Sequence, residues 1–271
     1  MKLFRRLLRQ RAAANLTPAP FVAASPEAEA AWDREDERYA IDATADLDGL
    51  GLMKALAVHR HRPISGTLAT IGRRYSMLHR DVLTLLYYLA RKTDGDILEI
   101  GPYIGGSTIA EAYGARAAGR RRALVTVENG GQMDHPTLPS RDIVADLKRN
   151  LAASGVADLV QIVVGAATAE KTGAEVRRYL GREGVGLLVM DADGEVRPAL
   201  AAYRDLLIDR CWVVIDDYYA PVGTAEEKGA KTKADVDALV AAGELETMGY
   251  YGWGTWFGRW HRSIADGSGR T

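Results

Sequence analysis

The chain has 271 residues, 47% of them hydrophobic and 26% charged, which allows one large α/β domain with an appendage but not two domains of typical size. Its 35 basic and 36 acidic residues give a net charge of −1, which argues against a general nucleic-acid-binding surface. A single cysteine, Cys211, excludes an intrachain disulfide, and no apolar run approaches the ~18 residues that cross a bilayer.

The first residues, MKLFRRLLRQRAAANL, place basic side chains around leucines, so a helix here would carry an apolar stripe flanked by cations. Such a segment can lie on anionic lipid or act as a transit peptide, although a frayed or docked terminal helix is the simpler interpretation. A stretch rich in Pro, Ala and Ser follows and is typical of a linker. We therefore expect an N-terminal helical extension and linker at 1–60, a core domain at 61–262 and a flexible tail at 263–271.

The core domain opens with an amphipathic helix and continues with alternating strands and helices. Residues 76–95 place Leu78, Val82, Leu85, Leu86 and Leu89 at helical spacing before Gly95. Five apolar runs follow, separated by helical stretches, at 96–101, 123–129, 160–166, 186–193 and 211–217. Runs that are apolar throughout indicate parallel strands covered on both faces. The pattern predicts a doubly wound, mostly parallel α/β sheet, whose ligands bind at the carboxyl ends of the strands where the strand order reverses.

The first apolar run leads into a glycine-rich turn, DILEIGPYIGGSTIA. The turn lacks the lysine of a P-loop, and Tyr103 stands where the dinucleotide fingerprint needs its second glycine. It offers instead backbone room at Gly101 and Gly105, the carboxylate of Glu99, and a helix N-terminus that we expect Ser107 to cap. These groups suit a ligand that carries an ammonium and a carboxylate at one end.

Glu128 ends the second predicted strand, where an acidic side chain can accept hydrogen bonds from both hydroxyls of a ribose. A ribose joined to an amino-acid tail describes S-adenosylmethionine. A lone glycine turn after a strand is a nicotinamide or nucleotide site about as often as a methyl-donor site, so the residues alone leave that alternative open.

The segment LEIGPYIGGST resembles the first motif of the class I S-adenosylmethionine-dependent methyltransferases, especially the Glu-x-Gly-x-Tyr-x-Gly-x-Ser pattern of the catechol O-methyltransferase branch. The resemblance spans residues 75–220 and implies a Rossmann-like, seven-stranded-type methyltransferase sheet. It implies cofactor contacts from Glu99, Gly101, Tyr103 and Ser107 at the methionine end, Glu128 at the ribose, Gly165 and Ala166 beside the adenine, and Gly105, Asn129 and Asp191 near them.

Acidic residues end the fourth and fifth predicted strands: Asp191 and Asp193 follow one, Asp216 and Asp217 the other. If these strands are neighbours, about 4.8 Å apart, the carboxylates converge on one edge of the sheet. Any one of them alone is readily a helix cap or a solvated strand end. Together, an all-oxygen set suits a hard ion such as Mg²⁺, with Mn²⁺ and Ca²⁺ as alternatives. We therefore interpret Asp191, Asp216 and Asp217 as metal ligands.

The metal-dependent O-methyltransferases that the sequence resembles take one Asp after the fourth strand and an Asp-Asn or Asp-Asp pair after the fifth. The Asp-Asp form is similar to the macrolide sugar O-methyltransferases. Asp217 replaces the usual Asn of the catechol and caffeoyl-coenzyme A enzymes, and Gly194 stands where the catechol enzyme has its catalytic lysine, which argues against a catechol substrate. Because a metal acidifies a coordinated hydroxyl, we expect Asp191 both to bind the ion and to take the proton, with Asp193 as second candidate.

Three further features bear on the site. His135, in a loop after the second strand, is a candidate base, although a loop histidine before proline is more often merely exposed. We expect structural roles for His59, His61 and His79. The aromatic block at 248–260 is expected to form the last strands of the sheet, with one face as a candidate substrate wall. The polar segment at 220–236 is predicted to be a loop over the site and a candidate lid.

The sequence thus predicts a cytoplasmic, divalent-metal-dependent O-methyltransferase that uses S-adenosylmethionine and acts on a sugar, polyol or phenolic hydroxyl of a secondary metabolite. The alternatives are a metal-independent methyltransferase, a related protein that uses the ion for other chemistry, and a non-catalytic nucleotide-binding protein tethered through its basic N-terminus. The expected partner is a small hydroxylated molecule rather than nucleic acid. The sequence also allows a homodimer and a membrane contact of the N-terminus.

Overall fold

The computed structural model describes residues 48–191, 193–219 and 226–262. The basic N-terminal segment, the Pro-rich stretch and the tail expected at 263–271 therefore lie outside the described residues. In the described part of the chain, no helix combines the length and the apolar character that crossing a membrane requires.

Seven strands form one sheet in the order β3-β2-β1-β4-β5-β7-β6. The strands are β1 (Asp96–Ile100), β2 (Leu124–Glu128), β3 (Val160–Val164), β4 (Val185–Met190), β5 (Leu207–Ile215), β6 (Leu245–Tyr251) and β7 (Thr255–Trp260). The pairs among β1 to β5 are parallel, whereas β7 runs antiparallel to both β5 and β6. The predicted doubly wound, mostly parallel sheet is confirmed, and the strand order reverses between β1 and β4.

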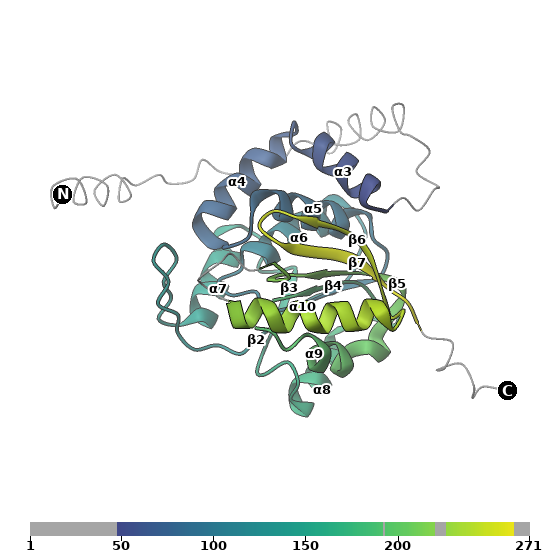
Figure 1. Cartoon of the computed structure of the whole chain (residues 1–271). Coiled ribbons are helices and arrows are strands. Elements are labelled where there is room, and N and C mark those ends of the chain that lie inside the picture. The colour runs from purple at the N-terminus through teal and green to yellow at the C-terminus, as the bar shows by residue number, and fades with distance from the viewer. Residues whose placement is uncertain (1–47, 192, 220–225, 263–271) are drawn as a thin grey trace.

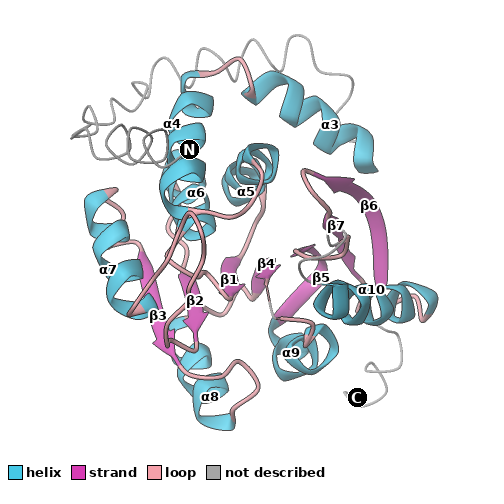
Figure 2. Ribbon diagram, turned by 60° about the vertical axis from the view of Figure 1, so that its left-hand side comes forward, coloured by secondary structure: helices cyan, strands magenta, loops and turns pink. Residues whose placement is uncertain are grey.

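Helices cover both faces of this sheet (Figures 1 and 2). One face carries α3 (Asp48–His59), α4 (Pro63–Tyr75), α5 (Arg80–Lys92), α6 (Gly106–Ala117) and α7 (Ile143–Ala153). The other carries α8 (Glu170–Tyr179), α9 (Val196–Tyr203), the short 3₁₀ helix η1 (Arg204–Leu206) and α10 (Glu226–Ala241). Each face has its own hydrophobic cluster, as expected for strands that are apolar on both sides.

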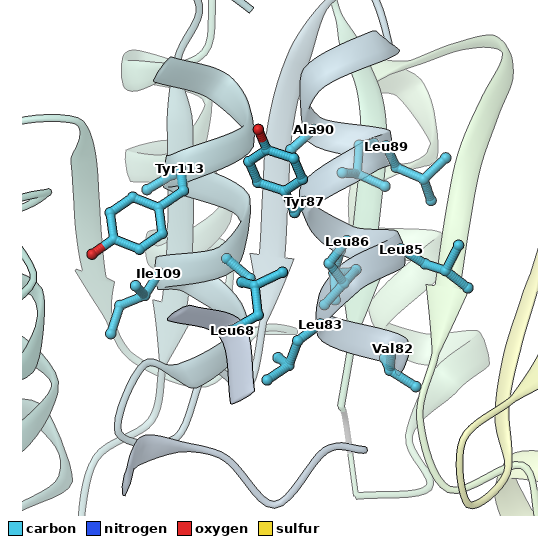
Figure 3. Close-up of a cluster of buried hydrophobic side chains, with 14 of the residues drawn as sticks. Leu68, Val82, Leu83, Leu85, Leu86, Tyr87, Leu89, Ala90, Ile109 and Tyr113 are labelled. Atoms are coloured by element: carbon cyan, nitrogen blue, oxygen red, sulfur yellow. The ribbon is translucent and has the colours of Figure 1, made fainter. Parts of the chain in front are cut away.

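The helix predicted at 76–95 is α5, which begins only at Arg80 because His79 is its N-cap: the His79 ring accepts a hydrogen bond of 3.1 Å from the Asp81 amide. Its leucines and valine are buried against α4 and α6, with Leu68 and Ile109 among their neighbours (Figure 3). Each fully buried leucine contributes roughly 1.5–3 kcal/mol by leaving water. This packing holds α5 beside the carboxyl edge of the sheet.

Helix α3, the last part of the predicted N-terminal extension, packs on α5 and β6. Its residues Leu52, Ala55 and Leu56 are buried in the same cluster as α5, and the Tyr251 hydroxyl donates a hydrogen bond of 2.9 Å to the carbonyl of Gly49. This part of the extension therefore shares the core of the domain.

The prediction of a loop at 220–236 is wrong for its second half, because α10 begins at Glu226. Thr232, Val236 and Leu239 are buried and lie on one helical face, toward α9 and β6. The lysines and acids that make the segment look like a loop occupy the remaining faces. Residues 220–225 lie outside the described part of the chain.

The aromatic block at 248–260 forms most of the last two strands, as expected. Trp256, Phe257 and Trp260 of β7 are buried, and Trp256 donates a hydrogen bond of 3.1 Å from Nε1 to the hydroxyl of Thr247. Trp253 stands apart in the turn between the strands and is exposed. Most of this block is therefore core, and its turn is free to contribute to the site.

Candidate active site

A cavity of about 350 Å³ opens at the carboxyl ends of β1, β4 and β5, beside the reversal of strand order. The strand ends contribute Glu99 to Gly101, Val189 to Asp191, Val214, Asp216 and Asp217. The segment before α5, the glycine turn, α10 and the turn between β6 and β7 supply the other walls. The cavity thus unites two features predicted separately, the glycine turn and the acidic strand ends.

The glycine turn is shaped by left-handed backbone. Gly101 has φ +78° and Gly105 has φ +99°, and a Cβ on Gly101 would lie 2.1 Å from the carbonyl oxygen of Asp191. The expected capping by Ser107 is wrong: α6 begins at Gly106, its N-cap is the left-handed Gly105, and no side chain caps it. A left-handed N-cap suits glycine, and Ser107 falls inside the first turn, where it lines the cavity.

Glu99 is 1% exposed and lines the cavity. Its Oε2 accepts hydrogen bonds from the hydroxyls of Thr108 at 2.5 Å and Thr126 at 2.8 Å, whereas Oε1 has no partner among the described residues. Burial raises the pKa of Glu99, and the nearby hydroxyls of Ser107, Thr108 and Thr126 oppose the rise. A buried carboxyl oxygen without a partner is costly, so Oε1 is available to a donor from a bound ligand.

Glu128, at the end of β2, is buried but does not line the cavity. Its Oε2 accepts a hydrogen bond of 3.1 Å from the Tyr103 amide, and its Oε1 accepts one of 2.8 Å from the Gly130 amide. Burial raises the pKa of Glu128, against the lowering effect of these amides. The residue thus ties the glycine turn to the next loop.

The remaining predicted cofactor residues follow the same edge of the sheet. Tyr103 has φ +52°, lines the cavity and donates a hydrogen bond from its hydroxyl to the carbonyl of Leu138. Asn129, Gly165 and Ala166 come directly after β2 and β3, outside the cavity wall. The predicted methionine, ribose and adenine positions therefore lie in the spatial order β1, β2, β3.

Residues Met190 and Ile215 are paired in register, so β4 and β5 are neighbours as the acidic cluster requires. Asp191, Asp216 and Asp217 each offer one carboxylate oxygen, and these atoms lie within 4.8 Å of one another. An all-carboxylate set of this size fits a hard divalent cation.

Hydrogen bonding and burial shape this cluster. The Thr255 hydroxyl at the start of β7 donates a hydrogen bond of 2.6 Å to Oδ1 of Asp216. Burial raises the pKa of Asp191 to about 7; Lys228 opposes the rise, and the charges of Asp216 and Asp217 add to it. Burial likewise raises the pKa of Asp216. Asp193, the second candidate base, stands outside the cluster with its side chain 86% exposed.

Sequence analysis missed Lys228, which lies on the first turn of α10. Its Nζ lies 2.9 Å from Oδ1 of Asp191 and 2.8 Å from Oδ1 of Asp193, and it also contacts Oδ2 of Asp217. Burial lowers its pKa, but the three carboxylates outweigh this effect and keep the ammonium charged. The sequence did not indicate a role for Lys228, because the segment was predicted to be a loop and only helix α10 directs this lysine toward the acidic residues.

Aromatic and histidine side chains complete the cavity. Trp253 is 66% exposed and meets the His79 ring edge to face at 5.1 Å, and both line the cavity. His135 also lines it, with Nδ1 accepting a hydrogen bond of 3.2 Å from the Leu138 amide. His59 is buried, with Nδ1 2.9 Å from the carbonyl of Ala55, and so has the expected structural role, whereas His61 is exposed and outside the cavity.

Comparisons with known proteins bear on this arrangement. Residues 98–218 match the family Methyltransf_24, described as a methyltransferase domain. A Staphylococcus aureus protein provisionally described as a caffeoyl-CoA O-methyltransferase is 18% identical with a TM-score of 0.56, over 78% of this chain and 99% of that one. The O-methyltransferase NovP is 16% identical with a TM-score of 0.52, over 79% and 99%. Cofactor-bound Rv0187 from MTB is 19% identical with a TM-score of 0.50, over 85% and 97%.

A comparison with curated protein sequences found no match. At identities below 20% the solved structures establish the fold, and the family match identifies the domain that contains the glycine turn and both pairs of strand-end acids. Residues 98–218 are therefore similar to a methyltransferase domain, and the fold is that of solved O-methyltransferases.

Proposed function

We propose that this methyltransferase transfers the methyl group of S-adenosylmethionine to a hydroxyl oxygen of a small molecule, and that it uses a divalent cation to do so. The observation that carries the proposal is that the glycine turn with Glu99 and the cluster of Asp191, Asp216 and Asp217 line one cavity. A methyl donor on the first feature and a hydroxyl on the second would be brought together, which converts a bimolecular reaction into an intramolecular one.

The cofactor residues support a donor with an amino-acid tail. The unpartnered Oε1 of Glu99 suits an ammonium group, and the backbone at Gly101 and Gly105 leaves room beside it. The full set that we propose is Glu99, Gly101, Tyr103, Gly105 and Ser107 at the methionine end, Glu128 and Asn129 at the ribose, Gly165 and Ala166 at the adenine, and Asp191 between cofactor and acceptor. S-adenosylmethionine, when bound, supplies the methyl group.

The proposed metal ligands are Asp191, Asp216 and Asp217, and Mg²⁺, Mn²⁺ or Ca²⁺ fits their oxygens. When bound, the ion lowers the pKa of a coordinated hydroxyl. The protein residues provide the rest: Thr255 fixes the position of Asp216, and the close packing of Gly101 on Asp191 fixes the distance between donor and acceptor sites.

Asp191 is the proposed proton acceptor, because its carboxylate lines the cavity within the cluster that would hold the acceptor hydroxyl. Asp193 remains the second candidate at the rim of the cluster. His135 also lines the cavity and is a further candidate base, outside the acidic cluster.

The cavity favours a small acceptor with an apolar or ring-shaped body. Its volume of about 350 Å³ lies at the lower end of ligand sites, and Trp253, Tyr103 and Tyr219 are among its lining residues. Aromatic walls suit a phenol, a sugar or a polyol carried on a larger secondary metabolite. No nucleic-acid partner is proposed. A homodimer, a membrane contact of the N-terminus and a cytoplasmic location stay predictions.

The first test is a calorimetric titration with S-adenosylhomocysteine, with NAD titrated in parallel. We expect one-to-one binding of the sulfur compound and none of NAD. NAD binding alone would overturn the cofactor assignment and return the glycine turn to the nucleotide-binding alternative.

The metal part is tested by replacing one ligand. Asp216→Asn should abolish metal-dependent turnover of a hydroxylated acceptor while leaving S-adenosylhomocysteine affinity nearly unchanged. Asp158→Asn is the matched control, because Asp158 is 79% exposed and distant from the cavity wall. Unchanged turnover in Asp216→Asn would contradict the role of the metal.

A metal-independent methyltransferase is the second candidate function, and Lys228 is the observation that favours it. Its ammonium already balances part of the negative charge of the cluster. Turnover that persists at full rate in a strong chelator would support this candidate over the first.

A further inference from the structure

Lys228 is the lysine of α10 that is directed at the acidic cluster. Its Nζ lies 2.9 Å from Oδ1 of Asp191 and also contacts Oδ2 of Asp217, two of the three proposed metal ligands. The next lysines on the helix have other partners: Lys231 pairs with Glu227 at 3.1 Å, and Lys233 pairs with Asp237. The contact of Lys228 is therefore specific to its place on the first turn.

The ammonium and a divalent cation would need the same carboxylates. A metal ion lies about 2.0–2.6 Å from its carboxylate oxygens, and the Lys228 ammonium already lies within hydrogen-bond distance of oxygens of Asp191 and Asp217. Two cations held by the same carboxylates lie only a few ångströms apart. Their repulsion is strong at that separation because little water screens this partly buried cluster.

Lys228 can leave the inner carboxylates and still keep a carboxylate partner. Its side chain is 26% exposed and its four-carbon stem is flexible. Asp193, 2.8 Å from Nζ, is 86% exposed and is not one of the proposed ligands. The ammonium thus has a carboxylate partner at the rim when the inner positions are taken by another cation.

We propose that Lys228 is a tethered counter-ion of the acidic cluster, which competes with the divalent cation for Asp191 and Asp217 and thereby weakens the metal affinity of the protein. The inference rests on the proposed metal-binding function. It makes Lys228 a residue that sets how much free metal the enzyme needs, rather than a group that acts on the substrate.

The test is a calorimetric titration of Mn²⁺ into the full chain and three variants. Lys228→Met keeps the apolar stem and removes the charge, and should bind Mn²⁺ at least about tenfold more tightly than the unmodified protein. Lys228→Arg keeps a cation and should not show this gain. Lys231→Met is the matched control one turn away, and should leave the affinity unchanged.

The outcomes separate this inference from the proposed function. Equal or weaker Mn²⁺ binding by Lys228→Met, with clear binding by the unmodified protein, overturns the competition and leaves the metal site standing. Absence of binding by both overturns the competition and the metal site together, while S-adenosylhomocysteine binding still tests the methyltransferase assignment separately.

A second measurement needs no variant, in case Lys228→Met does not fold. Amine acylation of the unmodified protein is followed by mass spectrometry with and without Mn²⁺. Displacement by the metal should raise the labelling of Lys228 several-fold relative to Lys231. Equal labelling of Lys228 at Mn²⁺ concentrations that saturate the site overturns the proposal.

Discussion

The backbone of Gly101 lies against the carbonyl of Asp191, so closely that a Cβ on Gly101 would stand 2.1 Å from that oxygen. The amide of Asp191 in turn donates a hydrogen bond of 2.9 Å to the carbonyl of Ile100. These contacts join the end of β1 to the end of β4. Backbone contacts therefore hold the proposed cofactor turn and the proposed metal cluster in a fixed relative position.

Gly101→Ala should destabilise the protein and weaken S-adenosylhomocysteine binding. Gly119→Ala is the matched control, because Gly119 also has positive φ, +67°, but has nothing within 4 Å of the added Cβ. We expect backbone strain to lower the free energy of unfolding of the control by about 1 kcal/mol. Overpacking should lower that of Gly101→Ala by about 1–3 kcal/mol more. Urea unfolding measures both. Equal losses would contradict the close approach of the two strand ends.

Thr255→Val should weaken metal binding without preventing folding. The substitution keeps the shape of the buried side chain but removes the hydroxyl that donates to Asp216. Loss of a hydrogen bond that orients a ligand typically reduces metal affinity about 10–100-fold. Thr255→Ser retains the hydroxyl and should recover most of the affinity in an Mn²⁺ titration. A serine variant as weak as the valine variant would point to packing rather than to the hydrogen bond.

Trp253→Ala should raise KM for the acceptor and leave S-adenosylhomocysteine affinity unchanged. Trp253 is exposed, lines the cavity and meets the ring of His79, so its removal takes away a wall rather than a piece of the core. A lost aromatic contact with a bound ring costs about 0.5–1.5 kcal/mol, or roughly a two- to twelvefold rise in KM. Tyr179→Ala, exposed outside the cavity, is the control and should change neither quantity.

Glu111→Gln should stabilise the protein at neutral and alkaline pH. Glu111 lies on α6, fully buried, and neither carboxyl oxygen has a hydrogen-bond partner among the described residues. Burial raises its pKa well above the usual value, and the charge of Glu99 adds to the shift. The folded state therefore holds this proton at pH values where the unfolded chain has released it. The stability of the unmodified protein should fall as pH rises above the unfolded pKa of about 4.3.

Because glutamine does not titrate, the contribution of this side chain to the pH dependence of the free energy of unfolding should vanish in Glu111→Gln. Urea unfolding from pH 4.5 to 8.5 should give free energies of unfolding that diverge with rising pH, by up to about 1.4 kcal/mol per pH unit for as long as the folded state keeps the proton that the unfolded chain has lost. Glu183→Gln, at an exposed position, should run parallel to the unmodified protein. Parallel curves for Glu111→Gln would mean that Glu111 is ionised in the fold.

The local sequence pattern was enough to predict the parallel strands of the sheet and the glycine turn. The strand predicted at 96–101 is β1, and the runs at 123–129, 160–166 and 186–193 contain β2, β3 and most of β4. Continuous apolar runs identify covered strands because both faces must leave water. The strand predicted at 211–217 begins earlier, at Leu207, because the polar residues Asp209 and Arg210 interrupt its apolar pattern.

The N-cap of α6 and the presence of helix α10 could not be predicted from local sequence. Serine is a common N-cap residue, but the chain enters α6 through the left-handed Gly105, so Ser107 lies two positions after the observed N-cap. In α10 only a few buried positions face the core, and the polar residues between them resemble a loop. Both errors arise where tertiary contacts outweigh local preference.

The sequence by itself determined the alternation of strands and helices, the glycine turn and the carboxylates at the strand ends, because each depends on residues close together in the chain. Only the tertiary structure decided that β4 and β5 are neighbours, that Thr255 from β7 reaches Asp216, and that Lys228 from α10 meets Asp191 and Asp217. These contacts join residues far apart in sequence, and they form because burying the apolar faces of β7 and α10 brings their polar residues to the carboxyl edge of the sheet.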